Sequence, residues 1–344
     1  VKKVIGSFYY DKSEILSFAK ISKLGLEDQT DNAGGGALNI DFNRYNVWTQ
    51  DLKTPPPLNY LDITSAKVDS HGLRFSRDKD VLEKELWRMH SLEKLEEIED
   101  LPVVNSVKYT GNFFQYLAKR HGIDLLFPKK KNVPKNAKRI AIHKGMILSK
   151  LSSLGIEYSN NLIAEMVLLR AAKYLKQEKL SLKGSAEAMR LWFKKRFPGL
   201  NWSKVTLDNG SGLTIHNKAS SKTMAKLLSL IDKDKDFEGG FLSYLSINGH
   251  DGGVVKRLKH PDFAYRVYAK TGSLYYVSNL SGYLVAKSGK RYAFSIFTSN
   301  PTNRNLLNKK NSPLLNKLRT ESSKWKFDAN EIIDNQLKKW IIER

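Results

Sequence analysis

Two short polar groups in the second half of the chain contain side chains that acyl-transfer chemistry uses. They are Ser159, Asn160 and Asn161 in the first group, and Lys270, Thr271, Gly272 and Ser273 in the second. Serine and lysine side chains move protons or act as nucleophiles when a neighbouring group activates them. A lysine next to a glycine, inside a strand-like stretch, indicates that a ligand must approach the backbone closely. The second group therefore predicts a binding edge rather than an ordinary strand.

Each group also has a simpler interpretation. Ser159 and Asn161 stand where a helix is expected to begin, and serine or asparagine is a common N-cap there. At average composition a Ser-x-Asn triplet arises by chance about once in a chain of this length, and Lys-Thr-Gly in about one chain in ten. Neither motif is specific by itself, so the two must be judged together.

A third candidate is the glycine-rich stretch at 208–214, with the sequence DNGSGLT. We expect a tight turn there that supports the site from behind, formed around Asp208, Gly210, Ser211 and Gly212. His216 and Asp251 are interpreted as structural residues.

The elements that must position these groups follow from the hydrophobic pattern of the second half. The pattern predicts helices at 143–155, 159–175, 185–197 and 220–231, strands at 263–270, 280–287 and 291–299, and an amphipathic helix at 328–344. Short turns join the three strands. Helices clustered beside an antiparallel sheet predict an α+β fold.

The first half has a different pattern. It predicts strands at 2–10 and 37–50, a charged helix at 79–100 and a helix at 107–122 that ends at Gly122. The run PKKKNVPKNAKR at 128–139 contains two prolines and is interpreted as a solvated linker, with a nucleic-acid patch as the alternative.

Composition excludes several classes of protein. The 344 residues contain no cysteine, which excludes disulfides, thiolate nucleophiles and cysteine-based metal sites. The seven histidines have no paired spacing, so a histidine-based metal site is not expected. No apolar run is long enough for an integral membrane segment. With 58 Lys and Arg against 35 Asp and Glu, the net charge of +23 favours an anionic partner. The signatures of nucleic-acid-binding modules are absent.

Larger blocks of sequence carry a resemblance to a known family. The blocks are GSFYYD, ALNIDFNRYNV, YSNNLIAEM, DNGSGLTIHN, LSINGHDGGV and AKTGSLYYVSNLSGYLVAKSGKRYAFSIFTSN, in this order. Together with the Ser-x-Asn and Lys-Thr-Gly motifs, they resemble the penicillin-binding protein 4 type of D-alanyl-D-alanine carboxypeptidase/endopeptidase. In the last block, residues 279–282 are expected to form a turn.

The resemblance implies a β-lactamase/transpeptidase-like antiparallel sheet flanked by helices, with an inserted, mainly-β accessory region on its N-terminal side. Residues 1–140 would be the accessory region. Residues 141–344 would be the catalytic domain, incomplete at its N-terminal part.

The resemblance also implies roles for individual residues. Ser159 would relay a proton to the leaving amine, Asn161 would hold a substrate amide and Lys270 would add positive potential. Thr271 and Ser273 would offer hydroxyls to the D-alanine carboxylate, and the Ser273 N–H would serve the oxyanion hole. Gly272 would let the substrate lie along the strand, and residues 273–276 would pair with its backbone.

The family's first motif, Ser-x-x-Lys, supplies the nucleophile and its base, and it is expected upstream of GSFYYD. The spacing occurs here at 17/20, 76/79, 91/94 and 323/326, and the first of these pairs fits a helix best. Because 17/20 lies in the accessory region, we expect that the sequence is the downstream portion of a longer enzyme. A leader removed before Val1 is the alternative. In isolation this portion should not be acylated by penicillin.

The implied activity is serine-type hydrolysis of D-Ala–D-Ala in peptidoglycan stem peptides, or of a D-Ala–diaminopimelate crosslink, through an acyl-enzyme. The resemblance implies no metal and no organic cofactor. The implied partners are these peptides and β-lactam antibiotics, with no nucleic acid, and the implied compartment is periplasmic or extracytoplasmic. Two rival functions stay open. One is a catalytically inactive homologue that binds wall peptides, and the other is an unrelated basic nucleic-acid-binding protein.

Overall fold

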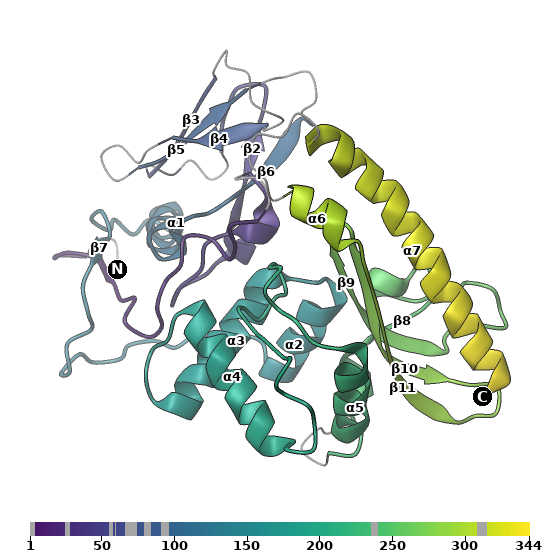
Figure 1. The fold of residues 1–344 in the computed structure, drawn as a ribbon. Helices are drawn as coiled ribbons and strands as arrows, with labels where there is room; N and C mark the ends of the chain where they lie inside the picture. Colours follow the sequence, from purple (N-terminus) through teal and green to yellow (C-terminus); the bar gives the residue numbers. More distant parts are fainter. Residues whose placement is uncertain are drawn as a thin grey trace. The chain divides into compact units, whose positions relative to one another are not determined.

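The structure is a computed structural model, and it describes residues 4–24, 28–54, 58, 60–65, 74–78, 84–90, 96–234, 240–307 and 315–344 (Figure 1). The chain divides into two compact units. Unit 1 comprises residues 1–145, 161–189 and 208–214, and unit 2 comprises residues 146–160, 190–207 and 215–344. The first division is near residue 145, but residues 161–189 and 208–214 of the expected domain 141–344 group with unit 1, and the expected domain assignment stays a prediction. The chain returns to unit 1 twice after this division, so each unit is discontinuous in sequence.

Unit 1 contains two small sheets, with strand orders β3-β5-β4 and β2-β6, and the short parallel pair β1-β7. The strands are β1 Tyr9–Tyr10, β2 Arg44–Trp48, β3 Leu61–Ser65, β4 Phe75–Arg77, β5 Glu85–Met89, β6 Ile98–Pro102 and β7 Lys129–Lys130. Buried aromatic and aliphatic side chains from these strands and from helix α1 (Ser106–Arg120) form one core, which includes Val47, Tyr60, Phe75, Trp87, Leu101 and Tyr109. This core holds the two sheets and α1 together.

The expected helix at 79–100 is wrong where the structure describes it. Residues 85–89 are strand β5 and residues 98–100 begin strand β6, whereas 79–83 and 91–95 lie outside the described residues. In β5 the side chains alternate between buried and more accessible positions, and Trp87 is only 1% exposed. Burial of alternate side chains favours a strand here over the helix preference of leucine, glutamate and lysine.

Unit 2 is built on a four-stranded sheet with the order β11-β10-β9-β8, and all its neighbouring pairs are antiparallel. Its strands are β8 Ser246–Ile247, β9 Val267–Leu274, β10 Val277–Val285 and β11 Arg291–Ser299. The register pairs Lys270 with Ser281 and Gly272 with Asn279, so residues 279–282 lie inside β10 and the expected turn there is wrong. The hairpin turn is instead at Tyr275 and Tyr276, and Tyr276 has φ 56°.

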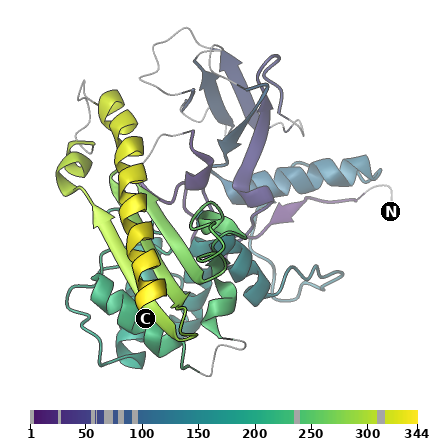
Figure 2. The same cartoon turned by 90° about the vertical axis from the view of Figure 1, so that its right-hand side faces the viewer.

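Two groups of helices cover the two faces of this sheet (Figures 1 and 2). On one face, Ile333, Leu337 and Ile341 of the long helix α7 (Leu315–Glu343) pack against β9, β10 and β11. On the other face, helix α5 (Ser221–Ile231) packs through Leu228 against Tyr283.

The other helices of the described chain are α2 Leu148–Glu157, α3 Asn161–Lys176, α4 Leu182–Arg196 and α6 Pro301–Leu307, with 3-10 turns η1 Thr30–Asn32, η2 Asp41–Asn43, η3 Phe241–Tyr244 and η4 Gly252–Val254.

The α+β class expected from the sequence is confirmed by these mixed helices and sheets. The apolar periodicity located α1, α3, α4 and α5 to within a few residues, but α2 begins later than expected and α7 begins earlier than 328. Of the expected strand at 2–10, the structure describes residues 4–10, and only Tyr9 and Tyr10 form a strand. Within 37–50 the strand is confined to β2.

Candidate active site

The candidate site of unit 2 begins at the edge of strand β9. Val267 directs its N–H to Asn248 Oδ1 at 2.8 Å and accepts the Asn248 N–H at 2.9 Å, so its polar backbone groups face β8. Because this orientation alternates along a strand, Thr271 and Ser273 direct their backbone groups to the same edge. Strand β8 pairs only with Tyr268 and Ala269. Beyond Ala269, no described strand pairs with this edge of β9.

Ser159 lies at the end of helix α2, not at the start of the next helix. Its N–H donates to the Ile156 carbonyl at 3.3 Å, and the Asn160 N–H donates to the Gly155 carbonyl at 2.9 Å. These bonds define a Schellman motif that places Ser159 at C′, where the backbone is left-handed and glycine is preferred. Ser159 has φ 53°. The expected N-cap role is therefore wrong, and a serine occupies a position that costs an L-residue about 1 kcal/mol.

Lys270 and Ser159, which are distant in sequence, meet in unit 2. The Lys270 Nζ donates to Ser159 Oγ and also to the Thr271 carbonyl at 2.9 Å. Burial lowers the pKa of the Lys270 ammonium below its usual value. No described carboxylate forms an ion pair with this ammonium. A partly desolvated cation without an anionic partner, beside a hydroxyl, can bind an anion and hold a proton relay.

The other predicted residues of β9 alternate between the two faces of the sheet. Lys270 and Gly272 lie on one face, whereas Thr271 and Ser273 lie on the face that also carries Val267 and Ala269. A ligand that approaches the open edge in the plane of the sheet is within reach of both faces. Gly272 and Ser273 are exposed. The structure thus places all of residues 270–273 at one accessible edge.

Gly272 is not required by the packing of the chain itself. Its φ is outside the left-handed region, and a Cβ added there would meet only the Cβ of Asn279, at 3.7 Å, which is an ordinary contact. Packing within the described chain therefore does not account for glycine at this position, and the close approach of a ligand stays a prediction.

The turn η4 packs against the side chain of Thr271, on the face of the sheet opposite to Lys270. A Cβ on Gly253 would lie 2.5 Å from Thr271 Oγ1, so only glycine lets this turn pack against that side chain. The Asp251 carboxylate accepts the Ile247 N–H at 2.7 Å. This bond fits the structural interpretation of Asp251.

Asn161 belongs to unit 1, where it is the first residue of helix α3. Its Nδ2 donates to the Asp31 carbonyl at 3.0 Å, and Asp31 lies in the 3-10 turn η1. The amide group is therefore oriented by the N-terminal part of the chain, and its predicted contact with substrate stays a prediction.

Glu165 was missed by sequence reasoning. It is fully buried in α3, and its carboxylate accepts the N–H groups of Gly210 at 3.0 Å and Ser211 at 2.9 Å. A Cβ on Gly210 would come within 2.9 Å of the Ala164 carbonyl oxygen, so the turn packs directly on the helix. The turn at 208–214 is thus tied to α3 one helical turn after Asn161. A single acidic residue among apolar neighbours was the available signal.

The Ser-x-x-Lys spacings do not share one structural setting. Phe18 pairs with Gly35 in an isolated bridge, so the expected helix around residues 17–20 is wrong. The pair at 323/326 lies on α7 and is exposed. Ser76 is in β4, while Lys79 and the pair at 91/94 lie outside the described residues.

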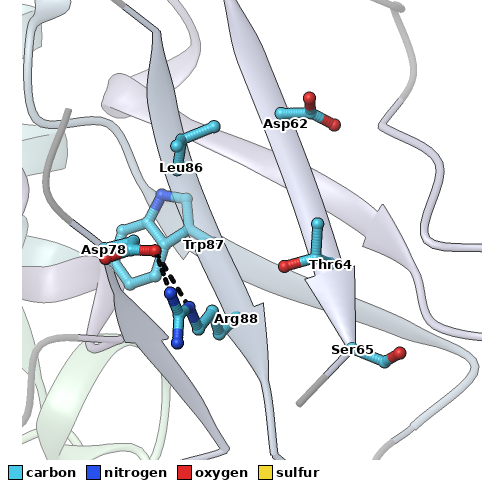
Figure 3. A pocket seen from close by; sticks show the side chains of 7 residues that line it. All are labelled: Asp62, Thr64, Ser65, Asp78, Leu86, Trp87 and Arg88. Carbon is cyan, nitrogen blue, oxygen red and sulfur yellow. Dashed lines mark hydrogen bonds and ion pairs between the residues drawn. The ribbon is translucent and has the colours of Figure 1, made fainter. Parts of the chain in front are cut away.

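Unit 1 has a separate surface pocket (Figure 3) between β3 and β5, lined by Asp62, Thr64, Ser65, Asp78, Leu86, Trp87 and Arg88. The Arg88 Nε donates to Asp78 Oδ2 at 2.9 Å, so this cation is already paired. The pocket lacks a nucleophile next to a base, and it carries no catalytic assignment. Across the described ranges no cluster of three metal-ligating side chains occurs, and no helix is long and apolar enough to cross a membrane.

Comparison with known proteins identifies the class and then the family. Residues 98–320, more than half of the chain, match the model of the D-Ala-D-Ala carboxypeptidase 3 (S13) family. The class is that of penicillin-binding carboxypeptidases related to peptidoglycan. Within it, the chain belongs to the S13 family, the family of penicillin-binding protein 4 (DacB).

A curated protein and two solved structures are similar to this chain. D-alanyl-D-alanine carboxypeptidase DacB of Haemophilus influenzae is 29% identical over 220 residues, which are 62% of this chain and 45% of that protein. The chain therefore spans less than half the length of this curated relative.

The crystal structure of penicillin binding protein 4 (dacB) from the same organism has a TM-score of 0.71 at 23% identity. The match covers 95% of this chain and 76% of that one. A second structure, complexed with a novel β-lactam, has a TM-score of 0.68 at 19% identity, covering 96% and 75%. At these identities the two structures show the fold alone.

Proposed function

We propose that this chain recognises peptides ending in D-Ala–D-Ala and carries the substrate-binding and proton-relay part of a serine-type D-Ala-D-Ala carboxypeptidase. The proposal rests mainly on one observation. The partly buried Lys270 ammonium has no described anionic partner, donates to Ser159 and lies at the open edge of β9. A terminal carboxylate supplies the missing negative charge.

The binding step follows from the edge geometry. The peptide lies along β9, with its carboxylate near the Lys270 ammonium and the hydroxyls of Thr271 and Ser273. Gly272 permits the close approach, and the Ser273 N–H, which faces the open edge, donates to the reacting carbonyl oxygen.

The chemical step needs a proton for the leaving amine of D-alanine. The attacking serine gives its proton to the base lysine of the Ser-x-x-Lys motif. The Ser159 hydroxyl, oriented by Lys270, relays this proton to the amine nitrogen as the scissile C–N bond breaks. The acyl group is carried by the nucleophilic serine of the family's Ser-x-x-Lys motif, and water then releases it.

The substrate class places the reaction outside the cytoplasm. D-Ala–D-Ala termini and D-Ala–diaminopimelate crosslinks occur in peptidoglycan, so the proposed compartment is periplasmic or extracytoplasmic. The proposed inhibitors are β-lactams, and one crystal structure with the same fold is complexed with a β-lactam.

The experiment is a comparison of two peptides that differ only in stereochemistry at their last two residues. The chain is expected to bind the D-Ala–D-Ala peptide at least tenfold more tightly than the L-Ala–L-Ala peptide, by calorimetry or NMR titration. Equal affinities, with wild-type folding by circular dichroism, would refute the proposed substrate class.

A binding role without hydrolysis is the alternative that the sequence left open. Of the Ser-x-x-Lys pairs that the structure describes at both positions, 17/20 is not helical and 323/326 is exposed on α7. Because the isolated chain is expected to remain unlabelled in either case, the candidates are separated by incubating the protein expressed from its full reading frame with a fluorescent penicillin, together with a D-alanine release assay. Covalent labelling with release of D-alanine supports the hydrolase, and stereospecific binding without either supports the binder.

A further inference from the structure

A long exposed segment of unit 1 contains only basic charges. We call residues 129–144 the basic segment. Its charged residues are Lys129, Lys130, Lys131, Lys135, Lys138, Arg139 and Lys144. The chain has no aspartate or glutamate between Asp124 and Glu157. In Figure 1 the chain leaves β7 as an irregular trace before α2 begins. All sixteen residues from 129 to 144 are exposed.

The same segment exposes aliphatic side chains between its cations. Ile140 is 93% exposed and Ile142 is 64% exposed, and Val133 is exposed as well. Single exposed aliphatic residues are common, but a basic segment with several of them is not a typical solvated linker. Cations together with aliphatic side chains are the composition of surfaces that bind the interface of an anionic bilayer.

The basic segment is anchored at its beginning. The N–H of Lys129 donates to the Phe8 carbonyl at 2.9 Å, and the Lys131 ammonium lies 4.9 Å from the centre of the Tyr9 ring. The Val133 N–H donates to the Asp11 carboxylate at 2.7 Å, which places one acidic group beside the segment. Beyond it, a turn forms where the Ala137 N–H donates to the Pro134 carbonyl at 3.0 Å. All side chains of residues 135–144 are exposed, so this part is accessible to a partner surface.

We propose that the basic segment is a peripheral binding site for an anionic phospholipid bilayer. The lysine and arginine side chains contact the headgroups, and Ile140 and Ile142 insert at the headgroup boundary. A nucleic acid fits less well, because bases would need stacking aromatic side chains and the segment has no Phe, Tyr or Trp. A second copy of this chain also fits poorly, since the net charge of +23 makes two copies repel.

The test measures partition of the full 344-residue chain to vesicles by co-sedimentation. Vesicles of phosphatidylcholine with phosphatidylglycerol are compared with phosphatidylcholine alone. The chain is expected to bind the anionic vesicles, and the variant K135Q/K138Q/R139Q/K144Q is expected to lose roughly 100-fold or more, at about fivefold for each cation near the surface. The variant I140S/I142S keeps every charge and is expected to lose about tenfold.

Matched controls separate the segment from general charge. The variant K176Q/K183Q/K194Q/K195Q removes four exposed cations from α3 and α4 and is expected to bind nearly as the wild type does. The proposal is overturned by no binding of the wild type, by an equal loss in this control or by unchanged binding of I140S/I142S. It is also overturned if the K135Q/K138Q/R139Q/K144Q variant loses affinity for a DNA duplex more than for vesicles. Because Lys270 is intact in every variant, these outcomes are independent of the proposed peptide site.

Discussion

Replacement of Ser159 separates the cost of its backbone conformation from the use of its hydroxyl. The residue is at C′ of α2 with φ 53°, and its Oγ accepts from the Lys270 ammonium. Ser159→Ala removes the hydroxyl and keeps the left-handed strain. Ser159→Gly removes both. The two variants therefore differ in the backbone alone.

The expected magnitudes follow from these two contributions. Relief of the left-handed strain stabilises the folded state by about 1 kcal/mol after the extra freedom of glycine in the unfolded chain is subtracted. Loss of the exposed hydrogen bond costs about 0.5 kcal/mol. We expect the free energy of unfolding to rise by roughly 0.5 kcal/mol in Ser159→Gly and to fall by roughly 0.5 kcal/mol in Ser159→Ala. The midpoint of thermal unfolding should differ between them by about 2–4 °C.

The functional loss should be the same in both variants. If Ser159 relays the proton, D-alanine release by the full enzyme should fall roughly 100-fold or more in each, because a positioned general acid contributes at least this factor. Gln177→Gly is the control, since Gln177 also has a left-handed backbone, with φ 58°. It should gain similar stability without a change in turnover. Equal stability of Ser159→Gly and Ser159→Ala would refute the left-handed assignment, and undiminished turnover would refute the relay.

Three further predictions concern the residues around this serine. Gly272→Ala should keep its thermal midpoint, since the chain leaves space for a Cβ, but it should bind a D-Ala–D-Ala peptide at least tenfold more weakly, because the methyl group blocks close approach. The control Gly199→Ala should change neither the thermal midpoint nor the affinity. Unchanged affinity in Gly272→Ala would contradict the close approach. Because burial lowers the Lys270 pKa, carboxylate binding should decline as pH rises through a value below that of an ordinary lysine. Lys270→Arg should remove this decline in a titration of affinity against pH, and a decline that persists in the variant would assign it to another group. Glu165→Ala should lower the free energy of unfolding, measured by urea denaturation, by about 2–3 kcal/mol, because it leaves two N–H groups without their acceptor. A loss below about 0.5 kcal/mol, the typical effect of a surface change, would contradict that role.

Much of the fold could be predicted from the sequence because local pattern and tertiary burial agree. In α5 and α7 the apolar positions follow the helical period, and the same positions are buried against the sheet. The helix at 79–100 failed where they disagree. Glutamate, leucine and lysine favour a helix there, but burial of Trp87 between the strands of unit 1 outweighs that preference.

The candidate site was only partly accessible to sequence reasoning. The residues at 159–161 and 270–273 could be selected by type, and the family resemblance connected them. The position of Ser159 could not be predicted, because a serine followed by two asparagines is typical of an N-cap and no glycine stands at C′ of α2. The backbone bonds from residues 159 and 160 to the Ile156 and Gly155 carbonyls place Ser159 at C′ instead. Glu165 could not be assigned either, since its partners at Gly210 and Ser211 are distant in sequence.

The docking of a terminal carboxylate at Lys270 can be measured with a double-mutant cycle. It compares a D-Ala–D-Ala peptide with its C-terminal amide, in the wild-type chain and in Lys270→Ala. The wild type should prefer the acid by about 10–100-fold, as a charge-assisted hydrogen bond of about 1.5–3 kcal/mol requires, and Lys270→Ala should lose this preference. The same preference in both proteins would show that the carboxylate binds elsewhere and would contradict the proposed site.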